Sequence, residues 1–189
     1  MSAPREHCYT TTVRWTGNAG TGTGSYRGYK RDHVIEAGGK PPIPGSSDPH
    51  FRGDAERWNP EELLVASLST CHQLWYLHLC AEAGVVVTAY EDHAEGTMIE
   101  NADGSGEFTR VVLHPCVTIR AGSDPRRARE LHHRAHALCF IARSVNFPVE
   151  CEPLIETEAD GFVRFLKAVC VTAPDRVART ARAIRRPAR

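Results

Sequence analysis

The sequence predicts one α+β domain. Strand-like segments occupy residues 8–37, a long apolar helix spans residues 59–82, and a hairpin, a second helix and a last strand reach residue 158. This order of elements is typical of α+β proteins. A chain of 189 residues can form one sizeable core and is short for two large domains.

The first segment contains two predicted strands. The residues Y-T-T-T-V-R-W, from position 9, are β-branched or aromatic, and the run G-N-A-G-T-G-T-G ends them. Residues 25–36, S-Y-R-G-Y-K-R-D-H-V-I-E, resume a strand-like alternation. Residues 38–54 are rich in Gly, Pro and Ser and predict a long loop, and loops of that length inside a domain are often functional.

The first helix has clear start and stop signals. Asn59 suits the N-cap, Pro60 the first helical position, and Glu61 and Glu62 complement the positive end of the helix dipole. Gly84 marks the end. The middle of this helix is apolar nearly all round, so we expect it to be central and buried.

A hairpin, a second helix and a final strand follow. Residues 85–98 and 107–121 predict two strands joined by the turn N-A-D-G at 101–104. The pair Asp124-Pro125 begins a helix that should end near residues 141–143. Residues 145–158 predict a strand, and their two prolines indicate an edge or bulged position.

Charge and hydropathy exclude several classes of function. The formal net charge is zero, so nothing in the overall composition indicates a nucleic-acid partner. From residue 161 onward, however, there are eight basic residues and one acidic residue, and we interpret residues 159–189 as a basic tail on a domain of residues 1–158. The first residues lack the apolar segment of a signal peptide, and no apolar run is long enough to span a bilayer. We therefore expect a cytoplasmic protein without membrane contact.

The seven cysteines are an odd number without regular spacing, and no C-x-x-C pair occurs. In a reducing compartment they should be free thiols unless they serve catalysis or metal binding. Cys71 lies within the apolar helix, where burial alone would make a thiol inert. A reactive Cys71 would need a positive neighbour, and the helix N-terminus is about 16 Å away.

The segment H-H-R-A-H-A-L-C at 132–139 offers a second group of candidates. His132, His136 and Cys139 share one helical face and could form part of a zinc site, with Cys71 and His72 as further donors. Alternatively, Cys71 and Cys139, each buried on one of the two helices, fit a redox pair in which a sulfenic acid is resolved as a disulfide. Spacing alone does not show that the two cysteines meet.

Two segments resemble the OsmC/Ohr family of organic hydroperoxide reductases. They are W-N-P-E-E-L-L-V-A-S-L-S-T-C-H at 58–72 and H-A-L-C-F-I-A-R-S-V-N-F-P-V at 136–149. The loop G-S-S-D-P-H-F-R-G-D at 45–54 is similar to the OsmC-like branch. The resemblance implies antiparallel sheets around two central helices in an intertwined homodimer, with active sites at the dimer interface.

The resemblance also implies roles for individual residues. The peroxidatic cysteine of the family falls on Cys71, the resolving cysteine on Cys139, and a glutamate that pairs with a thiolate-stabilising arginine on Glu61. The arginine itself is not assigned by spacing: Arg27 and Arg31 are the nearest candidates, with Arg52 and Arg143 as fallbacks. Many relatives have a proline after the second cysteine, where this chain has Phe140.

The sequence thus predicts a thiol peroxidase that reduces organic hydroperoxides through Cys71 and Cys139. It would need no metal, flavin or haem, and an external dithiol, either a small thiol or a lipoyl-type protein, would reduce the disulfide. Two alternatives stay open. One is a non-catalytic dimer that binds a hydrophobic ligand or senses redox state, and the other is a metal-binding module built from the histidine and cysteine cluster.

Overall fold

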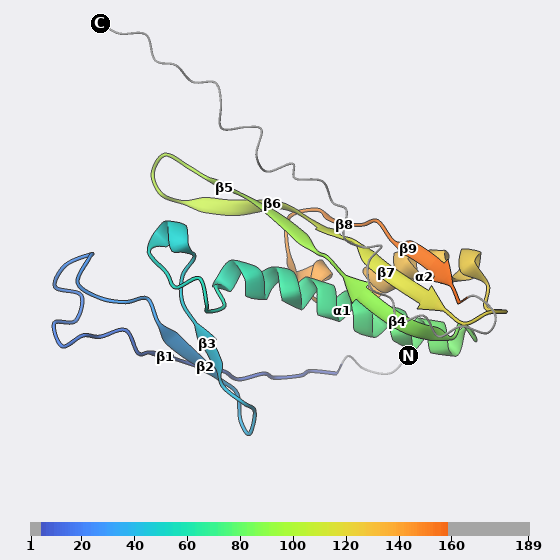
Figure 1. The fold of residues 1–189 in the computed structure, drawn as a ribbon, viewed down its shortest axis with the longest axis horizontal. Coiled ribbons are helices and arrows are strands. Elements are labelled where there is room, and N and C mark those ends of the chain that lie inside the picture. Colours follow the sequence, from blue (N-terminus) through green and yellow to red (C-terminus); the bar gives the residue numbers. More distant parts are fainter. Residues whose placement is uncertain (1–4, 159–189) are drawn as a thin grey trace, which may run out of the picture.

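Two α-helices and several short strands make up residues 5–158, the part of the chain that the structure, a computed structural model, describes (Figure 1). The strands are β1 (Thr12–Trp15), β2 (His33–Glu36), β3 (Ile43–Gly45), β4 (Val87–Asp92), β5 (Glu95–Glu100), β6 (Gly106–Leu113), β7 (Pro115–Ile119), β8 (Val149–Cys151) and β9 (Leu154–Thr157). The helices are α1 (Pro60–Glu82) and α2 (Pro125–Leu138), with single 3-10 turns at Pro49–Phe51 and Ala142–Ser144. The predicted α+β fold is confirmed. Neither helix is long and apolar enough to cross a bilayer.

The strands form three sheets, with the orders β1-β2-β3, β4-β7-β9 and β5-β6-β8. The two strands predicted for the central hairpin are each divided in two, so that β4 pairs with β7 and β5 with β6. Asp92 marks the division, because its carboxylate accepts hydrogen bonds from the His114 amide at 2.8 Å and from the Ser69 hydroxyl. A side chain therefore takes the place of a ladder partner at this bend.

The last predicted strand is also divided, and its direction corrects the expectation of wholly antiparallel sheets. Strand β8 runs parallel to β6, and β9 runs parallel to β7. Pro153 lies between them, and proline cannot continue a hydrogen-bonded ladder. Both strands lie at sheet edges, as the prolines predicted.

The N-terminal sheet is smaller than expected. Strand β2 covers only His33–Glu36, and the residues before it form turns in which the Asn18 side chain accepts the amides of Gly20 and Gly22 at 2.9 Å. The long loop predicted at 38–54 contains the short strand β3. In Figure 1 this sheet lies beside the N-terminal end of α1 and projects away from the other two sheets.

Local capping sets the bounds of α1. Asn59 accepts a hydrogen bond from the Glu62 amide at 2.7 Å, and the Glu62 carboxylate accepts one from the Asn59 amide at 3.2 Å. This capping box satisfies two amides that would otherwise lack partners. The helix ends at Glu82, and Gly84 takes the left-handed conformation, with φ of 72°, that permits the chain to leave.

Helix α2 begins as predicted and ends earlier. Asp124 caps it by accepting a hydrogen bond from the Arg126 amide at 2.9 Å. The last helical residue is Leu138, and Cys139 has the extended conformation (φ −65°, ψ 112°). The predicted end at 141–143 included the separate 3-10 turn, which gives helix-like local geometry without continuing α2.

Helix α1 contributes to two apolar clusters. The larger cluster lies between α1, α2 and the β4-β7-β9 sheet, and it includes Tyr76, Leu79, Val117, Ile119 and Leu131. The smaller cluster joins Leu68 to Val111 and Leu113 of β6. Complete burial of such side chains contributes roughly 1.5–3 kcal/mol each. The two clusters fix α1 against both sheets and so determine which way its functional side chains point.

Candidate functional site

Cys71 lies on α1 at the wall of a cavity of about 950 Å³. Most of the lining is apolar or aromatic: Leu74 and Trp75 follow Cys71 on α1, and Phe140 and Ile141 come from the segment after α2. The rings of Trp75 and Phe140 meet nearly at right angles, with their centroids 5.7 Å apart. A ligand with an alkyl or aryl group fits this lining better than a small polar one.

Cys139 lies next to Cys71. It is the C-cap residue of α2, only 1% of it is exposed, and its Sγ lies 3.4 Å from the Ala142 amide. Burial and, to a lesser extent, a hydrogen bond with the Cys71 side chain raise the pKa of Cys139 to about 11, whereas the Ala142 amide opposes the shift. Both thiols are free. The structure therefore brings together the two cysteines that the sequence singles out.

Glu61 does not reach Cys71 within one chain. It lines a separate cavity of about 500 Å³, together with Ser69, Asp92 and Phe108, and Thr70 lines both this cavity and that of Cys71. One carboxylate oxygen of Glu61, Oε2, is buried without a hydrogen-bond partner among the described residues. A buried carboxylate oxygen without a partner carries a desolvation cost that a cation would relieve.

None of the candidate arginines lines the Cys71 cavity in this chain. Arg31 donates hydrogen bonds to the carbonyls of Tyr29 (2.7 Å) and Tyr26 (2.9 Å), and its guanidinium lies over both rings. Arg143 lies 3.5 Å from the Ala137 carbonyl, and Arg27 is exposed. Among the described residues, the basic ones that line the cavity are Lys40 and His78, and His78 pairs with Glu82 at 3.4 Å.

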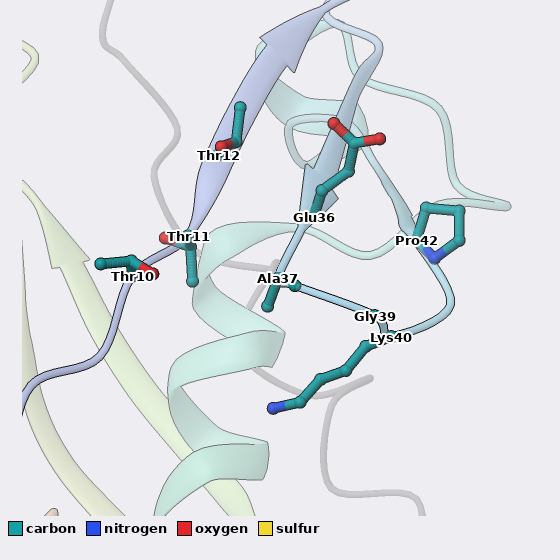
Figure 2. Close-up of a pocket in the computed structure, with 9 residues that line it drawn as sticks. Thr10, Thr11, Thr12, Glu36, Ala37, Gly39, Lys40 and Pro42 are labelled. Atoms are coloured by element: carbon teal, nitrogen blue, oxygen red, sulfur yellow. The ribbon is translucent and has the colours of Figure 1, made fainter.

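Lys40 also borders a second, smaller depression of about 320 Å³ on the N-terminal sheet (Figure 2). The other described residues of its lining are the threonines at positions 10–12, Glu36, the turn at 37–39 and Pro42. Figure 2 shows the Lys40 amine extending toward a helix at one end of this depression. Among the described residues, no cysteine or histidine lines it, so it offers neither a thiol nor an imidazole.

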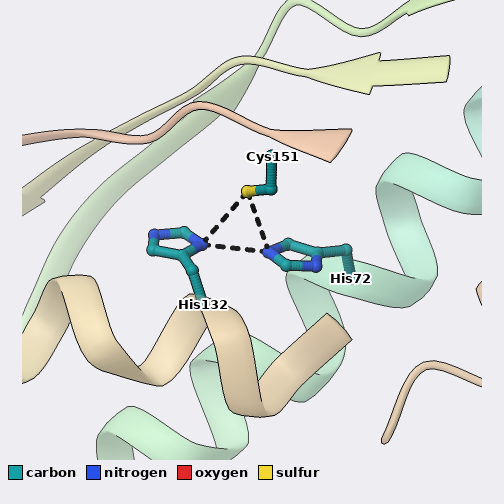
Figure 3. A group of neighbouring side chains, drawn as sticks. All are labelled: His72, His132 and Cys151. Carbon is teal, nitrogen blue, oxygen red and sulfur yellow. Dashed lines mark hydrogen bonds between the residues drawn. The ribbon is translucent and has the colours of Figure 1, made fainter. Parts of the chain in front are cut away.

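A third group of side chains was predicted only in part from the sequence. His72 on α1, His132 on α2 and Cys151 on β8 point toward one another (Figure 3). Their side-chain donor atoms all lie within 4.8 Å of one another, and His72 Nε2 lies 2.9 Å from His132 Nδ1. His132 and His72 were both candidate donors, but His136 and Cys139 do not belong to this group. Cys151 was not among the candidates from the sequence, because nothing local indicates that its strand would carry a cysteine to the two helices.

Burial controls the protonation of this group. It lowers the pKa of His72 to about 4 and that of His132 to about 3, with the charges of neighbouring basic residues acting in the same direction. Burial, together with the nearby carboxylates of Asp92 and Glu152, raises the pKa of Cys151 to about 12. At neutral pH, both imidazoles and the thiol are therefore uncharged.

Comparisons with known proteins agree on one family. The model of the OsmC-like protein family matches residues 53–153. An OsmC-like protein of unknown function from Vibrio cholerae is 32% identical, and the match covers 79% of this chain and 100% of that one with a TM-score of 0.72. No curated protein matches.

More distant structures share the fold. An organic hydroperoxide resistance protein from Elizabethkingia anophelis is 17% identical, with 82% of this chain and 100% of that chain covered and a TM-score of 0.57. An organic hydroperoxide resistance protein from Legionella pneumophila is also 17% identical, with 80% and 99% covered and a TM-score of 0.57. The family match and the Vibrio relative together show that the chain belongs to the OsmC-like protein family.

Proposed function

We propose that this protein is a thiol peroxidase that reduces organic hydroperoxides. The Cys71 thiolate attacks the terminal oxygen of ROOH, the O–O bond breaks, and the alkoxide leaves as ROH after taking up a proton. Cys71 becomes a sulfenic acid. The Cys139 sulfur then displaces the sulfenic hydroxyl, which leaves as water, and a Cys71–Cys139 disulfide forms. An external dithiol reduces the disulfide and is itself oxidised to a disulfide.

The observation that carries this proposal is the contact between the Cys71 and Cys139 side chains beside an apolar cavity. A disulfide requires the Cα atoms of the two cysteines to lie within about 7 Å of each other. A hydrogen bond between the two thiols favours such a separation. The raised pKa keeps Cys139 protonated while Cys71 reacts. The hydroxide that leaves the sulfenic acid can then accept the Cys139 proton to form water, so the step needs no other base.

The substrate class follows from the cavity. Leu74, Trp75, Phe140 and Ile141 offer an apolar surface to the R group of a hydroperoxide. Hydrogen peroxide has no such group and gains nothing from this lining. We therefore propose a preference for hydroperoxides with bulky alkyl or aryl groups, with no metal, flavin or haem in the reaction.

The proposal includes a homodimer that completes the site. Glu61 and Cys71 are ten residues apart on α1, about 15 Å along a straight helix, so Glu61 cannot serve the thiol of its own chain directly. An antiparallel α1 of a partner subunit would bring one chain's Glu61 toward the other chain's thiol. The arginine that pairs with Glu61 and stabilises the thiolate would be Arg27 or Arg31.

Two features support a partner. Leu74 on α1 is 67% exposed and Phe140 is 68% exposed, although both are large and apolar. Of the 23 residues of α1, only Leu68, His72, Tyr76, Leu79 and Cys80 are buried. A helix that is apolar nearly all round and covered on one side leaves a surface that a second subunit would bury.

The test is stoichiometric oxidation of the reduced protein by cumene hydroperoxide, followed by mass spectrometry of the peptides. We expect one equivalent of cumyl alcohol per chain and a Cys71–Cys139 linkage. Cys71→Ser should abolish reduction, whereas Cys139→Ser should consume one equivalent and stop at a sulfenic acid that dimedone traps. Cys80→Ser, at a buried cysteine outside the cavity, is the matched control.

A wild-type protein that leaves cumene hydroperoxide unchanged would reject the peroxidase. Saturable binding of the intact hydroperoxide without its reduction would instead favour the non-catalytic hydrophobic-ligand binder, since the same cavity would hold the ligand.

A further inference from the structure

The structure contains a second constellation that the peroxidase reaction does not use: His72, His132 and Cys151, from three different elements. We propose that these three side chains bind a zinc ion that joins α1, α2 and β8. The thiols that the peroxidase would use, Cys71 and Cys139, are not among the ligands.

The distances fit a tetrahedral site. Zinc bonds of about 2.0–2.1 Å to nitrogen and about 2.3 Å to sulfur place tetrahedral ligand atoms about 3.3 Å apart for two nitrogens and about 3.6 Å for nitrogen and sulfur. In the structure, His72 Nε2 and His132 Nδ1 are 2.9 Å apart. Cys151 Sγ lies 3.6 Å from His72 Nε2 and 3.8 Å from His132 Nδ1. Shifts of a few tenths of an ångström convert this triangle into three ligands of one ion.

The ring orientations also fit. Coordination through His72 Nε2 and His132 Nδ1 requires protons on the other two ring nitrogens, His72 Nδ1 and His132 Nε2. Both of these atoms are buried without a hydrogen-bond partner among the described residues, so no donor opposes the required tautomers. Tyr76 stacks on the His132 ring at a centroid distance of 3.8 Å and holds its plane.

The protonation and charges favour a cation that tolerates sulfur. Both imidazoles are neutral at pH 7. In the metal-free protein one of the two facing nitrogens carries the proton of their hydrogen bond, so ion binding requires that ring to change tautomer and the Cys151 thiol to lose its proton. Zinc with one thiolate leaves a net charge of +1. Asp92 and Glu152, whose charges act on Cys151, would offset it. A thiolate with two imidazoles is a donor set typical of zinc, whereas magnesium and calcium prefer oxygen ligands.

An adjoining cavity gives the ion a route and a fourth ligand. The cavity has a volume of about 630 Å³, and both His132 and Cys151 line it together with His133, His136 and Glu152. Water from this cavity would complete the tetrahedron. The ion would then connect the middles of α1 and α2 to the end of β8.

Metal binding itself is the test. Protein made without a histidine tag, reduced and freed of metal, is titrated with Zn²⁺ against a chromophoric chelator, and its metal content is measured after desalting. We expect about one zinc per chain, release of about one proton per ion at pH 7, and a thiolate-to-cobalt charge-transfer band when Co²⁺ replaces zinc.

Four variants assign the ligands. Cys151→Ser and His132→Gln should each weaken zinc binding at least about tenfold. His133→Gln changes a neighbouring histidine of the same cavity and should bind as the wild type does. The double variant Cys71→Ser/Cys139→Ser should also retain zinc, which separates this site from the peroxidase thiols.

The proposal is overturned if the wild type binds no zinc at tens of micromolar or if cobalt gives no thiolate band, and neither result depends on whether a variant folds. It is equally overturned if Cys151→Ser binds zinc as tightly as the wild type, or if the double variant loses zinc.

Discussion

The rings of Trp75 and Phe140 meet edge to face across the Cys71 cavity, with centroids 5.7 Å apart and an interplanar angle of 81°. Phe140 thus adds an aromatic wall to this cavity. Such a pair contributes about 0.5–1.5 kcal/mol beyond the burial of its area. The residue after Cys139 therefore shapes the cavity beside Cys71.

Phe140→Ala should raise KM for cumene hydroperoxide about two- to tenfold, because part of the aryl-binding wall is removed. The rate with H2O2 should change little, since that substrate does not use the wall. Steady-state kinetics with both peroxides check this, and Ile99→Ala, at an exposed apolar residue outside the cavity, is the control. Equal changes in the kinetics with cumene hydroperoxide and with H2O2 would contradict the proposal that Phe140 contacts the aryl group.

The raised pKa of Cys139 predicts a pH dependence. Because the thiolate reacts, the rate at which iodoacetamide modifies Cys139 should rise about tenfold per pH unit up to a plateau near pH 11. Site-resolved mass spectrometry of the reduced protein measures it. A plateau below pH 9 would contradict the effect of burial on this thiol.

The same shift affects stability at alkaline pH. Burial favours the neutral thiol, so the folded pKa is raised from 9.0 to about 11, and the unfolded chain releases its proton first. The contribution of Cys139 is thus complete below about pH 9 and is lost as the pH rises toward 11. Urea unfolding at several pH values should show a steeper alkaline decrease for wild type than for Cys139→Ser.

Glu61→Gln should lower kcat/KM about ten- to hundredfold, the usual effect of losing a hydrogen bond to a charged group. Arg27→Ala and Arg31→Ala are tested separately. The variant that removes the partner of Glu61 should lower kcat/KM by a similar factor, and adding Glu61→Gln to it should lower kcat/KM little further. Arg127→Ala removes an exposed arginine that pairs with Glu130 and is the control. Additive losses in the double variant would contradict the pairing.

Leu74→Arg should weaken the dimer, because it places a charge on the exposed apolar face of α1. Ala81→Arg, at an exposed position near the end of the same helix, should not. Sedimentation measures the association. For the wild type, specific activity should fall on dilution below the dissociation constant, and a fully active wild-type monomer would refute the shared site.

Local signals predicted the helices well. Asn59, Pro60 and Gly84 act through their nearest neighbours, so the bounds of α1 could be inferred from the sequence. The capping partner Glu62 was identifiable too, as the residue three positions after the cap. The end of α2 was predicted a turn too late, because the separate 3-10 turn continues the apolar pattern.

Contacts between distant segments could not be predicted in the same way. The parallel pairing of β8 with β6 brings Cys151 to His72 and His132, and nothing within residues 145–158 encodes that pairing. The resemblance to a family singled out Cys71 and Cys139, but only the packing of α1 against the end of α2 shows that they touch. The arginine proposed to stabilise the thiolate would reach it only in the proposed dimer, and none of the candidate arginines lines the Cys71 cavity of a single chain.

The end of α2 at Leu138 has a mechanical consequence. Cys71 lies within a continuous helix and has little freedom to move, whereas Cys139 lies just beyond a helix, on backbone with extended geometry followed by a single 3-10 turn. Any approach of the two sulfur atoms to bonding distance should therefore be made by the Cys139 side. During the redox cycle, hydrogen exchange should become faster at the amides of residues 139–148, while the amides around Cys71 stay protected. Cys71 would then stay fixed in its helix, and the segment that carries Cys139 would move.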